Sequence, residues 1–209
     1  MREEYVVRIF VSGGCKNGKS YYAQRLAAAQ AKQGDGSFAS LESRRTVPLL
    51  LPPLHPLYYI ATMKPVDTED EARIERHRED REGWGFITVE QPVCIEGIIE
   101  KCERRGSFLL DSLTALLANE MFPPDGRVNE QAAESITCGL TTILDEIENI
   151  VIVSDYIYSD AIFYDYLTGK YRKYLAMLDR AAATQCDAVI EVAYTGVRVH
   201  KGSLVGFVV

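Results

Sequence analysis

The sequence predicts an α/β fold in one domain over residues 1–209, with a mostly parallel sheet covered by helices on both faces. Short apolar segments rich in β-branched residues alternate along the chain with longer segments of helical composition. A glycine-bounded loop, Gly13–Ser20, follows the first apolar segment and fits a phosphate-binding pattern. The composition, 47% hydrophobic and 25% charged residues, is that of an ordinary globular protein.

The first half of the chain predicts three strands and three helices. The strands are built from apolar and β-branched residues, and the helices from Ala, Gln, Leu and charged residues at helical spacing. A stretch between the first helix and the second strand, residues 32–56, holds four prolines and several glycines and serines. We expect it to be an atypical loop insertion, with a functional lid as the alternative. The expected strands are 5–11, 57–61 and 86–89, and the expected helices are 19–33, 68–81 and 93–104.

The second half continues the alternation to the C-terminus. Its apolar segments are SFLLD, IVIV and AVIEV, and its helical segments are longer than those of the first half. We expect strands at 107–111, 150–153 and 188–192, helices at 129–148 and 164–185, and a pair of short strands within 197–209.

Charge and cysteine content exclude several function classes. A net charge of −7 disfavours nucleic-acid binding, which needs a positive face. The five cysteines form no C-x-x-C pair, so we expect reduced thiols and neither a disulfide framework nor a zinc site. No stretch approaches the roughly 20 apolar residues of a membrane helix, and we expect a cytoplasmic protein without a membrane span.

The loop GGCKNGKS fits G-x-x-x-x-G-K-[ST] in the required context, between a strand and a helix. Its glycines let backbone N–H groups turn toward phosphate oxygens, and the following helix adds its positive end. Lys19 is expected to bridge the β- and γ-phosphates of GTP or ATP, and Ser20 to offer a hydroxyl to Mg²⁺. The loop residues are Gly13, Gly14, Cys15, Lys16, Asn17, Gly18, Lys19 and Ser20.

Asp111 ends an apolar strand, where an acid commonly holds the Mg²⁺ shell of a phosphate-loop enzyme. The alternative is that Asp111 and Ser112 cap a helix that begins at Leu113. Both interpretations follow from the same position in the sequence.

His77 lies on a charged helical segment, four residues from Arg73 and four from Arg81. All three residues share one helix face, and two cations there should depress the pKa of the imidazole and keep it neutral. A neutral histidine beside a bound nucleotide can attack phosphorus. The alternative is a solvated surface helix.

Four segments together resemble one known family. The phosphate loop, then LYYIATM, ARIERHREDREGWGFITVE and FLLDSLTALLANEMF, occur in the order found in adenosylcobinamide kinase/adenosylcobinamide-phosphate guanylyltransferase. The tail CDAVIEVAYTGVRVHKG also resembles that family's final strands. The resemblance implies a RecA-like fold, a trimer, and an enzyme of cobalamin synthesis that uses GTP or ATP, Mg²⁺ and a corrinoid.

The resemblance also implies roles for single residues. His77 matches the histidine that takes GMP from GTP. Other positions match segments that contact the nucleotide, and Asp111 joins Ser20 as a candidate metal ligand. Beyond the phosphate loop, the implied nucleotide-binding residues are Ala61, Thr62, Met63, Arg78, Glu79, Asp80, Arg81, Glu90 and Asp111.

The sequence departs from the family pattern at three places. Asn17 stands where relatives usually have Ser, and Asp155–Tyr158 replace an Asn-Glu-Val-Gly segment that lies at the carboxyl end of the sheet. The insertion at 32–56 is also atypical. These departures leave two alternatives open, a small-molecule kinase without guanylyl transfer and a nucleotide-binding protein that has lost catalysis.

Overall fold

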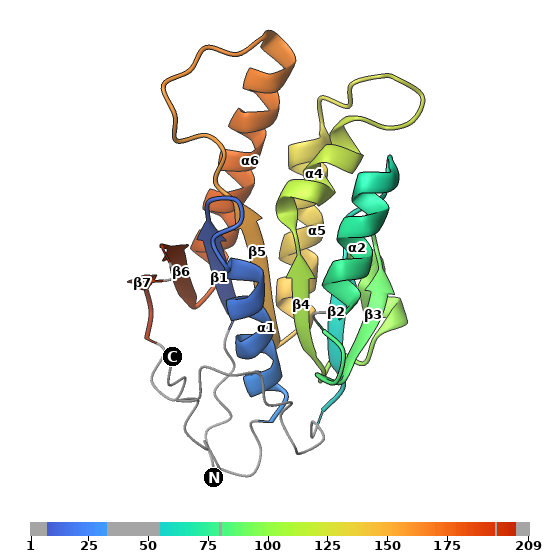
Figure 1. Ribbon diagram of the computed structural model, residues 1–209, viewed down its shortest axis with the longest axis vertical. Helices are drawn as coiled ribbons and strands as arrows, with labels where there is room; N and C mark the ends of the chain where they lie inside the picture. Colours follow the sequence, from blue (N-terminus) through green and yellow to red (C-terminus); the bar gives the residue numbers. More distant parts are fainter. Residues whose placement is uncertain (1–7, 33–54, 80, 195, 204–209) are drawn as a thin grey trace.

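The computed structural model describes residues 8–32, 55–79, 81–194 and 196–203 (Figure 1). It forms one seven-stranded sheet in the order β3-β2-β4-β5-β1-β6-β7. All neighbouring strands pair in parallel except β6 and β7, which are antiparallel. The strands are β1 (Arg8–Gly13), β2 (Leu57–Ala61), β3 (Phe86–Glu90), β4 (Ser107–Asp111), β5 (Asn149–Asp155), β6 (Ala188–Ala193) and β7 (Gly196–Lys201).

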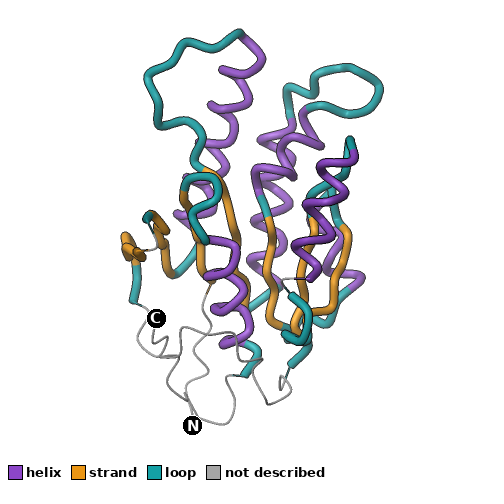
Figure 2. Tube along the Cα trace, in the orientation of Figure 1, coloured by secondary structure: helices purple, strands orange, loops and turns teal. Residues whose placement is uncertain are grey.

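Helices cover both faces of the sheet (Figures 1 and 2). Two helices lie on the face toward the viewer, α1 (Lys19–Gln30) and α2 (Thr68–Glu79). The opposite face is covered by α3 (Ile98–Lys101), α4 (Leu113–Met121), α5 (Ala132–Glu146) and α6 (Tyr166–Gln185). The predicted RecA-like, mostly parallel α/β fold is confirmed.

Alternate residues along each strand build two separate cores. Ile9 and Val11 pack with α1, whereas Phe10 between them packs with the helices of the other face. The same alternation separates Leu109 from Leu110 on β4. Because side chains alternate between faces along a strand, position in a strand decides which face a residue serves.

Several expected elements differ from the structure in extent. Only a 3₁₀ turn, η1 (Ile95–Gly97), and the short α3 occupy the helix expected at 93–104. Its expected start is interrupted because Cys94 takes a left-handed conformation, φ 50°, and the Gln91 side chain donates to the carbonyls of Val93 and Cys94. One strand, β7, lies in the described part of 197–209. Residues 5–7, 33–54 and 204–209, which fall within expected elements, lie outside the described residues.

Among the helices of the described residues, none is both long and apolar enough to span a bilayer.

Candidate nucleotide site

The phosphate loop connects the carboxyl end of β1 to the first turn of α1, as the motif predicts. Two residues of the turn have positive φ, Lys16 at 57° and Gly18 at 88°. Gly18 precedes α1 directly, and its carbonyl accepts the N–H of Tyr22 at 3.1 Å. Glycine adopts this left-handed conformation without a steric cost, which explains the second glycine of the motif.

Gly13 allows a close approach between the loop and β6. A Cβ at this position would lie 2.4 Å from Asn17 Nδ2 and 2.5 Å from the carbonyl oxygen of Val192. The Asn17 amide donates to that same carbonyl, and Asn17 Oδ1 accepts the N–H of Lys19 at 3.2 Å. Asn17, the departure from the family pattern, therefore connects the loop to β6 through a side-chain hydrogen bond.

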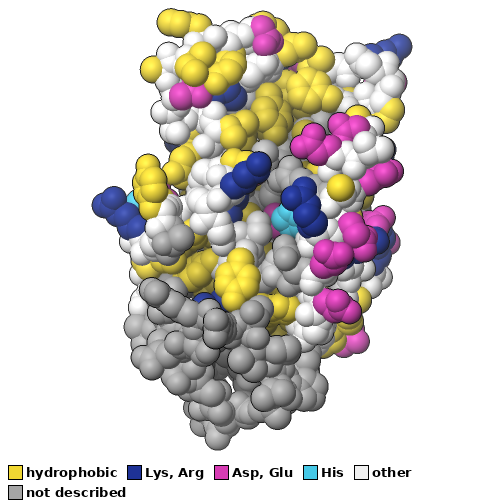
Figure 3. Space-filling view, viewed as in Figure 1, with side chains coloured by type: hydrophobic (Ala, Val, Ile, Leu, Met, Phe, Trp, Pro, Cys, Tyr) yellow, Lys and Arg dark blue, Asp and Glu magenta, His cyan; other side chains and the backbone are white. Residues whose placement is uncertain are grey.

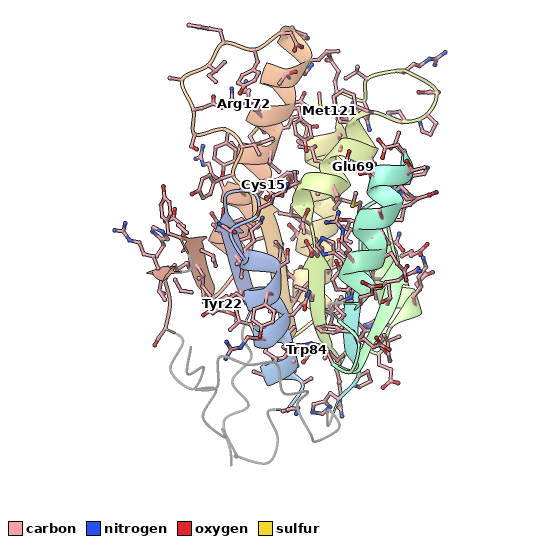
Figure 4. The ribbon with its side chains drawn as sticks, in the orientation of Figure 1. Cys15, Tyr22, Glu69, Trp84, Met121 and Arg172 are labelled. Carbon is pink, nitrogen blue, oxygen red and sulfur yellow. The ribbon has the colours of Figure 1, made fainter. Side chains whose placement is uncertain are left out.

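Lys19 is buried at the inner side of the loop, with 6% of its surface exposed. Its ammonium donates to the Gly14 carbonyl at 3.2 Å and forms an ion pair with Asp155. Ser20 beside it is half-buried, whereas Cys15, at the tip of the loop in Figure 4, is exposed. The lysine thus lies inside the turn, as the motif requires of a phosphate ligand.

Five strand-end residues share the carboxyl edge and one face of the sheet. Ala61 pairs in register with both Glu90 and Asp111, and Gly13 pairs with Asp155. Each of the five lies two or four residues after a residue that packs with α1, so each faces the α1 side. The predicted residues Gly13, Ala61, Glu90 and Asp111 therefore lie along one edge and one face of the sheet. Ala61 lies between Glu90 and Asp111, and Gly13 is two strands further along from Asp111.

Asp111 is held by Tyr59, whose hydroxyl donates to Asp111 Oδ2 at 3.0 Å. The helix-cap alternative is confirmed for the next residue, since Ser112 Oγ accepts the N–H of Ala115 at 3.4 Å. Asp111 thus keeps its carboxylate at the sheet edge, and Ser112 caps the start of α4.

Among the described residues there is no group of three or more His, Cys, Asp or Glu side chains that could hold a metal. The donor set of one carboxylate and one hydroxyl still fits Mg²⁺, which takes most ligands from substrate phosphates and water.

Thr62 joins the end of β2 to the end of β4. Its hydroxyl donates to the Ser112 carbonyl at 2.8 Å and accepts the Ser112 N–H at 2.7 Å. Its carbonyl accepts from Asn119 Nδ2 at 2.7 Å, and its side chain is fully buried. Because both hydrogen bonds of the hydroxyl are made to the backbone of Ser112, Thr62 stabilises the fold. It thereby positions its half-buried neighbours Ala61 and Met63.

The helix that carries His77 turns one stripe toward the sheet. Asp70, Ile74 and His77 are half-buried, whereas its other residues with a described side chain are exposed. This spacing of four and three residues marks a single helix face. Figure 3 shows basic side chains and a histidine near the middle of this face of the molecule, with acidic side chains along its α2 edge.

The segment after α2 is anchored on the α1 face of the sheet. Arg81, 7% exposed, places its guanidinium carbon 3.6 Å from the centre of the Tyr59 ring. Trp84 meets Tyr21 of α1 edge to face, and Figure 4 shows it alongside that helix. The end of the His77 helix and the first turn of α1 therefore lie on the same side of the sheet.

Arg78 of α2 and Glu90 at the end of β3 form an exposed ion pair. The Arg78 guanidinium is 3.8 Å from Glu90 and 3.5 Å from Glu75. An open cavity of about 620 Å³ adjoins this pair, lined in part by Arg78, Glu79, Arg81 and Phe86. The Asp80 residue and the Arg73 side chain lie outside what the structure describes.

Asp155 is the residue that the sequence interpretation missed. It was seen only as a departure from the family pattern, yet its carboxylate holds Lys19, and its N–H donates to Thr114 Oγ1 at 2.9 Å. The available signal was its position as an acid close to the end of an apolar strand, a position similar to that of Asp111.

A buried carboxylate lies on the opposite face of β5. Asp179 of α6 is 4% exposed and accepts the Tyr158 hydroxyl at 2.7 Å. Burial is the main cause that raises the pKa of this carboxyl to about 6. Asp179 is therefore a titratable group of the core and does not belong to the phosphate loop.

Comparison with known proteins identifies a family whose profile matches this chain. The profile described as cobinamide kinase / cobinamide phosphate guanyltransferase matches residues 9–200. No curated protein matches the sequence. A solved structure from Pyrococcus horikoshii OT3, described as a structural study, has 9% sequence identity and a TM-score of 0.44, and the match covers 94% of this chain and 86% of that chain. That likeness is too weak to carry a functional argument.

Proposed function

This chain belongs to the cobinamide kinase / cobinamide phosphate guanyltransferase family, and we propose that it catalyses both reactions with adenosylcobinamide as the acceptor. It would first phosphorylate adenosylcobinamide and then transfer GMP from GTP to adenosylcobinamide phosphate. The observation that carries the proposal is the shared face: the phosphate loop, Asp111 and the inward stripe of α2 with His77 all lie on the α1 side of the sheet.

Triphosphate binding is proposed at Gly13–Ser20. The backbone N–H groups of the turn and the positive end of α1 would hold the phosphate oxygens, and Lys19 would bridge the β- and γ-phosphates. Ser20 and Asp111 would hold Mg²⁺, which neutralises charge on the phosphates when bound. Tyr59 supports this role because its hydroxyl fixes the orientation of the Asp111 carboxylate.

The guanylyl transfer is proposed to run through His77. The imidazole nitrogen would attack the α-phosphorus of GTP, a phosphorus–nitrogen bond would form, and pyrophosphate would leave. A phosphate oxygen of the corrinoid would then attack the same phosphorus and release the histidine. The inward position of His77 on α2 supports this assignment, since an outward side chain could not reach a nucleotide held by α1.

The nucleoside of GTP is proposed to lie beside the second half of α2. Arg78, Glu79, Asp80, Arg81 and Glu90 are assigned to it by the family resemblance. The cavity beside the exposed Arg78 supports the assignment, because a guanidinium group can hydrogen-bond to a planar base and stack on it. Ala61, Thr62 and Met63 would border the site from the end of β2.

Assembly and location complete the proposal. We propose a homotrimer in the cytoplasm, with GTP or ATP and a corrinoid as partners and no nucleic acid. The net charge of −7 supports the last point.

The test is a product analysis. Purified protein is incubated with adenosylcobinamide, Mg²⁺ and either ATP or GTP, and the corrinoids are separated and identified by mass. Adenosylcobinamide phosphate and adenosylcobinamide-GDP are both expected from the wild type with GTP. Lys19→Ala should lose both products, and His77→Ala should still make the phosphate but no GDP derivative.

Other results would select the alternatives. Formation of the corrinoid phosphate alone would identify a kinase without guanylyl transfer. Nucleotide binding without either product would identify a protein that has lost catalysis.

A further inference from the structure

The ion pair between Lys19 and Asp155 has a consequence for the kinase step. Lys19 Nζ contacts the Gly14 carbonyl of the phosphate loop and the carboxylate of Asp155 at the end of β5. A triphosphate needs the same ammonium for its β- and γ-phosphates. For Lys19 to bind the phosphates, its ammonium therefore has to leave the Asp155 carboxylate.

Asp155 itself is fixed by the backbone. It is the last residue of β5, paired in register with Gly13 of β1. Its N–H donates to Thr114 Oγ1 at 2.9 Å, and the next N–H, of Tyr156, donates to the Gly13 carbonyl at 3.2 Å. The carboxylate thus stays beside the loop after Lys19 has moved to the phosphates.

A free carboxylate beside a γ-phosphate is electrostatically unfavourable unless a hydrogen-bond donor lies between them. The acceptor alcohol of the kinase reaction is such a donor, since its O–H can point to the carboxylate while its oxygen faces the γ-phosphorus. Only 18% of the Asp155 side chain is exposed, so few water molecules compete for this place.

We propose that Asp155 is the catalytic base of the kinase step; this inference rests on the proposed function. The alcohol proton passes to the Asp155 carboxylate, and the alcohol oxygen forms a bond to the γ-phosphorus. The bond between the γ-phosphorus and the bridging oxygen breaks, and the nucleoside diphosphate leaves with that oxygen. Asp155 returns its proton to water after the product departs.

Guanylyl transfer does not need this base. The imidazole of His77 attacks without an alcohol proton to remove, and the phosphorylated corrinoid attacks with an oxygen that is already anionic. Loss of the carboxylate should therefore separate the two activities.

The experiment compares Asp155→Asn with the wild type in three assays. Asparagine keeps the size and the hydrogen-bonding capacity of the side chain but does not take the proton. We expect kcat for phosphorylation of adenosylcobinamide to fall about 10²–10⁴-fold. Guanylylation of the protein by GTP and the transfer to synthetic adenosylcobinamide phosphate should stay within threefold of wild type.

Two further variants keep the outcome clear. Asp160→Asn removes another aspartate from an ion pair, that with Arg172, away from the loop, and serves as the matched control. Asp155→Glu restores a carboxylate and should recover part of the kinase rate.

Kinase activity of Asp155→Asn within tenfold of wild type would overturn the inference, as would an equal loss of both activities. Wild-type protein that makes neither product refutes the proposed function, and the inference with it. Wild-type protein that makes both products while Asp155→Asn does the same refutes the inference alone.

Discussion

Tyr21 and Trp84 meet edge to face, with ring centroids 6.0 Å apart and an interplanar angle of 86°. Tyr21 belongs to the first turn of α1, two residues after Lys19, and Trp84 lies between α2 and β3. The contact therefore ties the segment that follows His77 to the helix that follows the phosphate loop. Arg81 adds a second tie by stacking on Tyr59 of β2.

Replacing Trp84 by leucine should slow guanylylation of the protein without weakening triphosphate binding. An edge-to-face pair stabilises a contact by about 0.5–1.5 kcal/mol beyond its buried area. Its loss corresponds to a decrease of roughly 2–13-fold in the population of molecules in which the segment after α2 is packed on α1. Rapid-quench measurement of GMP incorporation and calorimetry with GTP give the two quantities. Trp84→Phe, which keeps a ring, is the matched control and should stay close to wild type. Equal losses in rate and affinity would show that the contact supports the loop itself.

Gly13→Ala should destabilise the protein and weaken nucleotide binding, because its Cβ would meet the Val192 carbonyl at 2.5 Å. Overpacking of this kind costs about 1–3 kcal/mol in the free energy of unfolding. Gly14→Ala is the control, since no atom lies within 4 Å of a Cβ there. Urea unfolding without nucleotide should place Gly14→Ala within about 0.5 kcal/mol of wild type. If the two variants unfold alike, the close approach at Gly13 is not a constraint.

Thr62→Val should cost more stability than Thr62→Ser. Valine removes the hydroxyl that accepts the Ser112 N–H, whereas the Ser112 carbonyl keeps the Leu116 N–H as a donor at 3.1 Å. An N–H left without an acceptor away from water costs about 1–3 kcal/mol. Serine keeps both hydrogen bonds and loses only a methyl group. Thermal and urea unfolding of the two variants measure the difference, and the reverse order would contradict the role assigned to this hydroxyl.

Asp179→Asn should make the protein less sensitive to pH. Burial raises the pKa of Asp179 from 3.8 to about 6, so the folded state holds this proton more tightly than the unfolded state. The carboxylate therefore lowers stability as pH rises from about 4 to about 6, and the loss persists above pH 6. Between pH 4 and pH 8, the free energy of unfolding of the variant should rise relative to that of the wild type by up to about 3 kcal/mol. This follows from about 1.4 kcal/mol per pKa unit. A difference between the two proteins that does not change with pH would contradict the raised pKa.

Local patterns predicted the sheet well. Each strand from β2 to β6 lies within two residues of its expected bounds, because apolar, β-branched segments have few alternatives in a buried parallel sheet. The expected helix at 93–104 was wrong at its start. The Gln91 side chain donates to the nearby carbonyls of Val93 and Cys94, and Glu120 of α4 accepts the Cys94 N–H at 2.7 Å. Helical composition does not reveal these side-chain contacts.

The phosphate loop and Asp111 could be identified from motif and position, whereas the partner of Lys19 could not. That ion pair depends on β5 lying beside β1, and strand order is a property of the whole fold. Likewise, the inward direction of His77 follows from how the segment 81–84 packs on α1 and β2, not from the spacing of charges along α2. Residues of one motif were therefore predictable, and contacts between motifs were not.

We expect a nucleotide held by the phosphate loop to come within reach of His77. Intact-mass measurement after incubation with GTP and Mg²⁺, without corrinoid, tests this arrangement. The wild type should gain one GMP per chain, which mild acid removes, which peptide mapping localises to His77 and which is absent from His77→Ala. Wild-type protein that binds GTP with unchanged mass, or carries GMP on another residue, would contradict it.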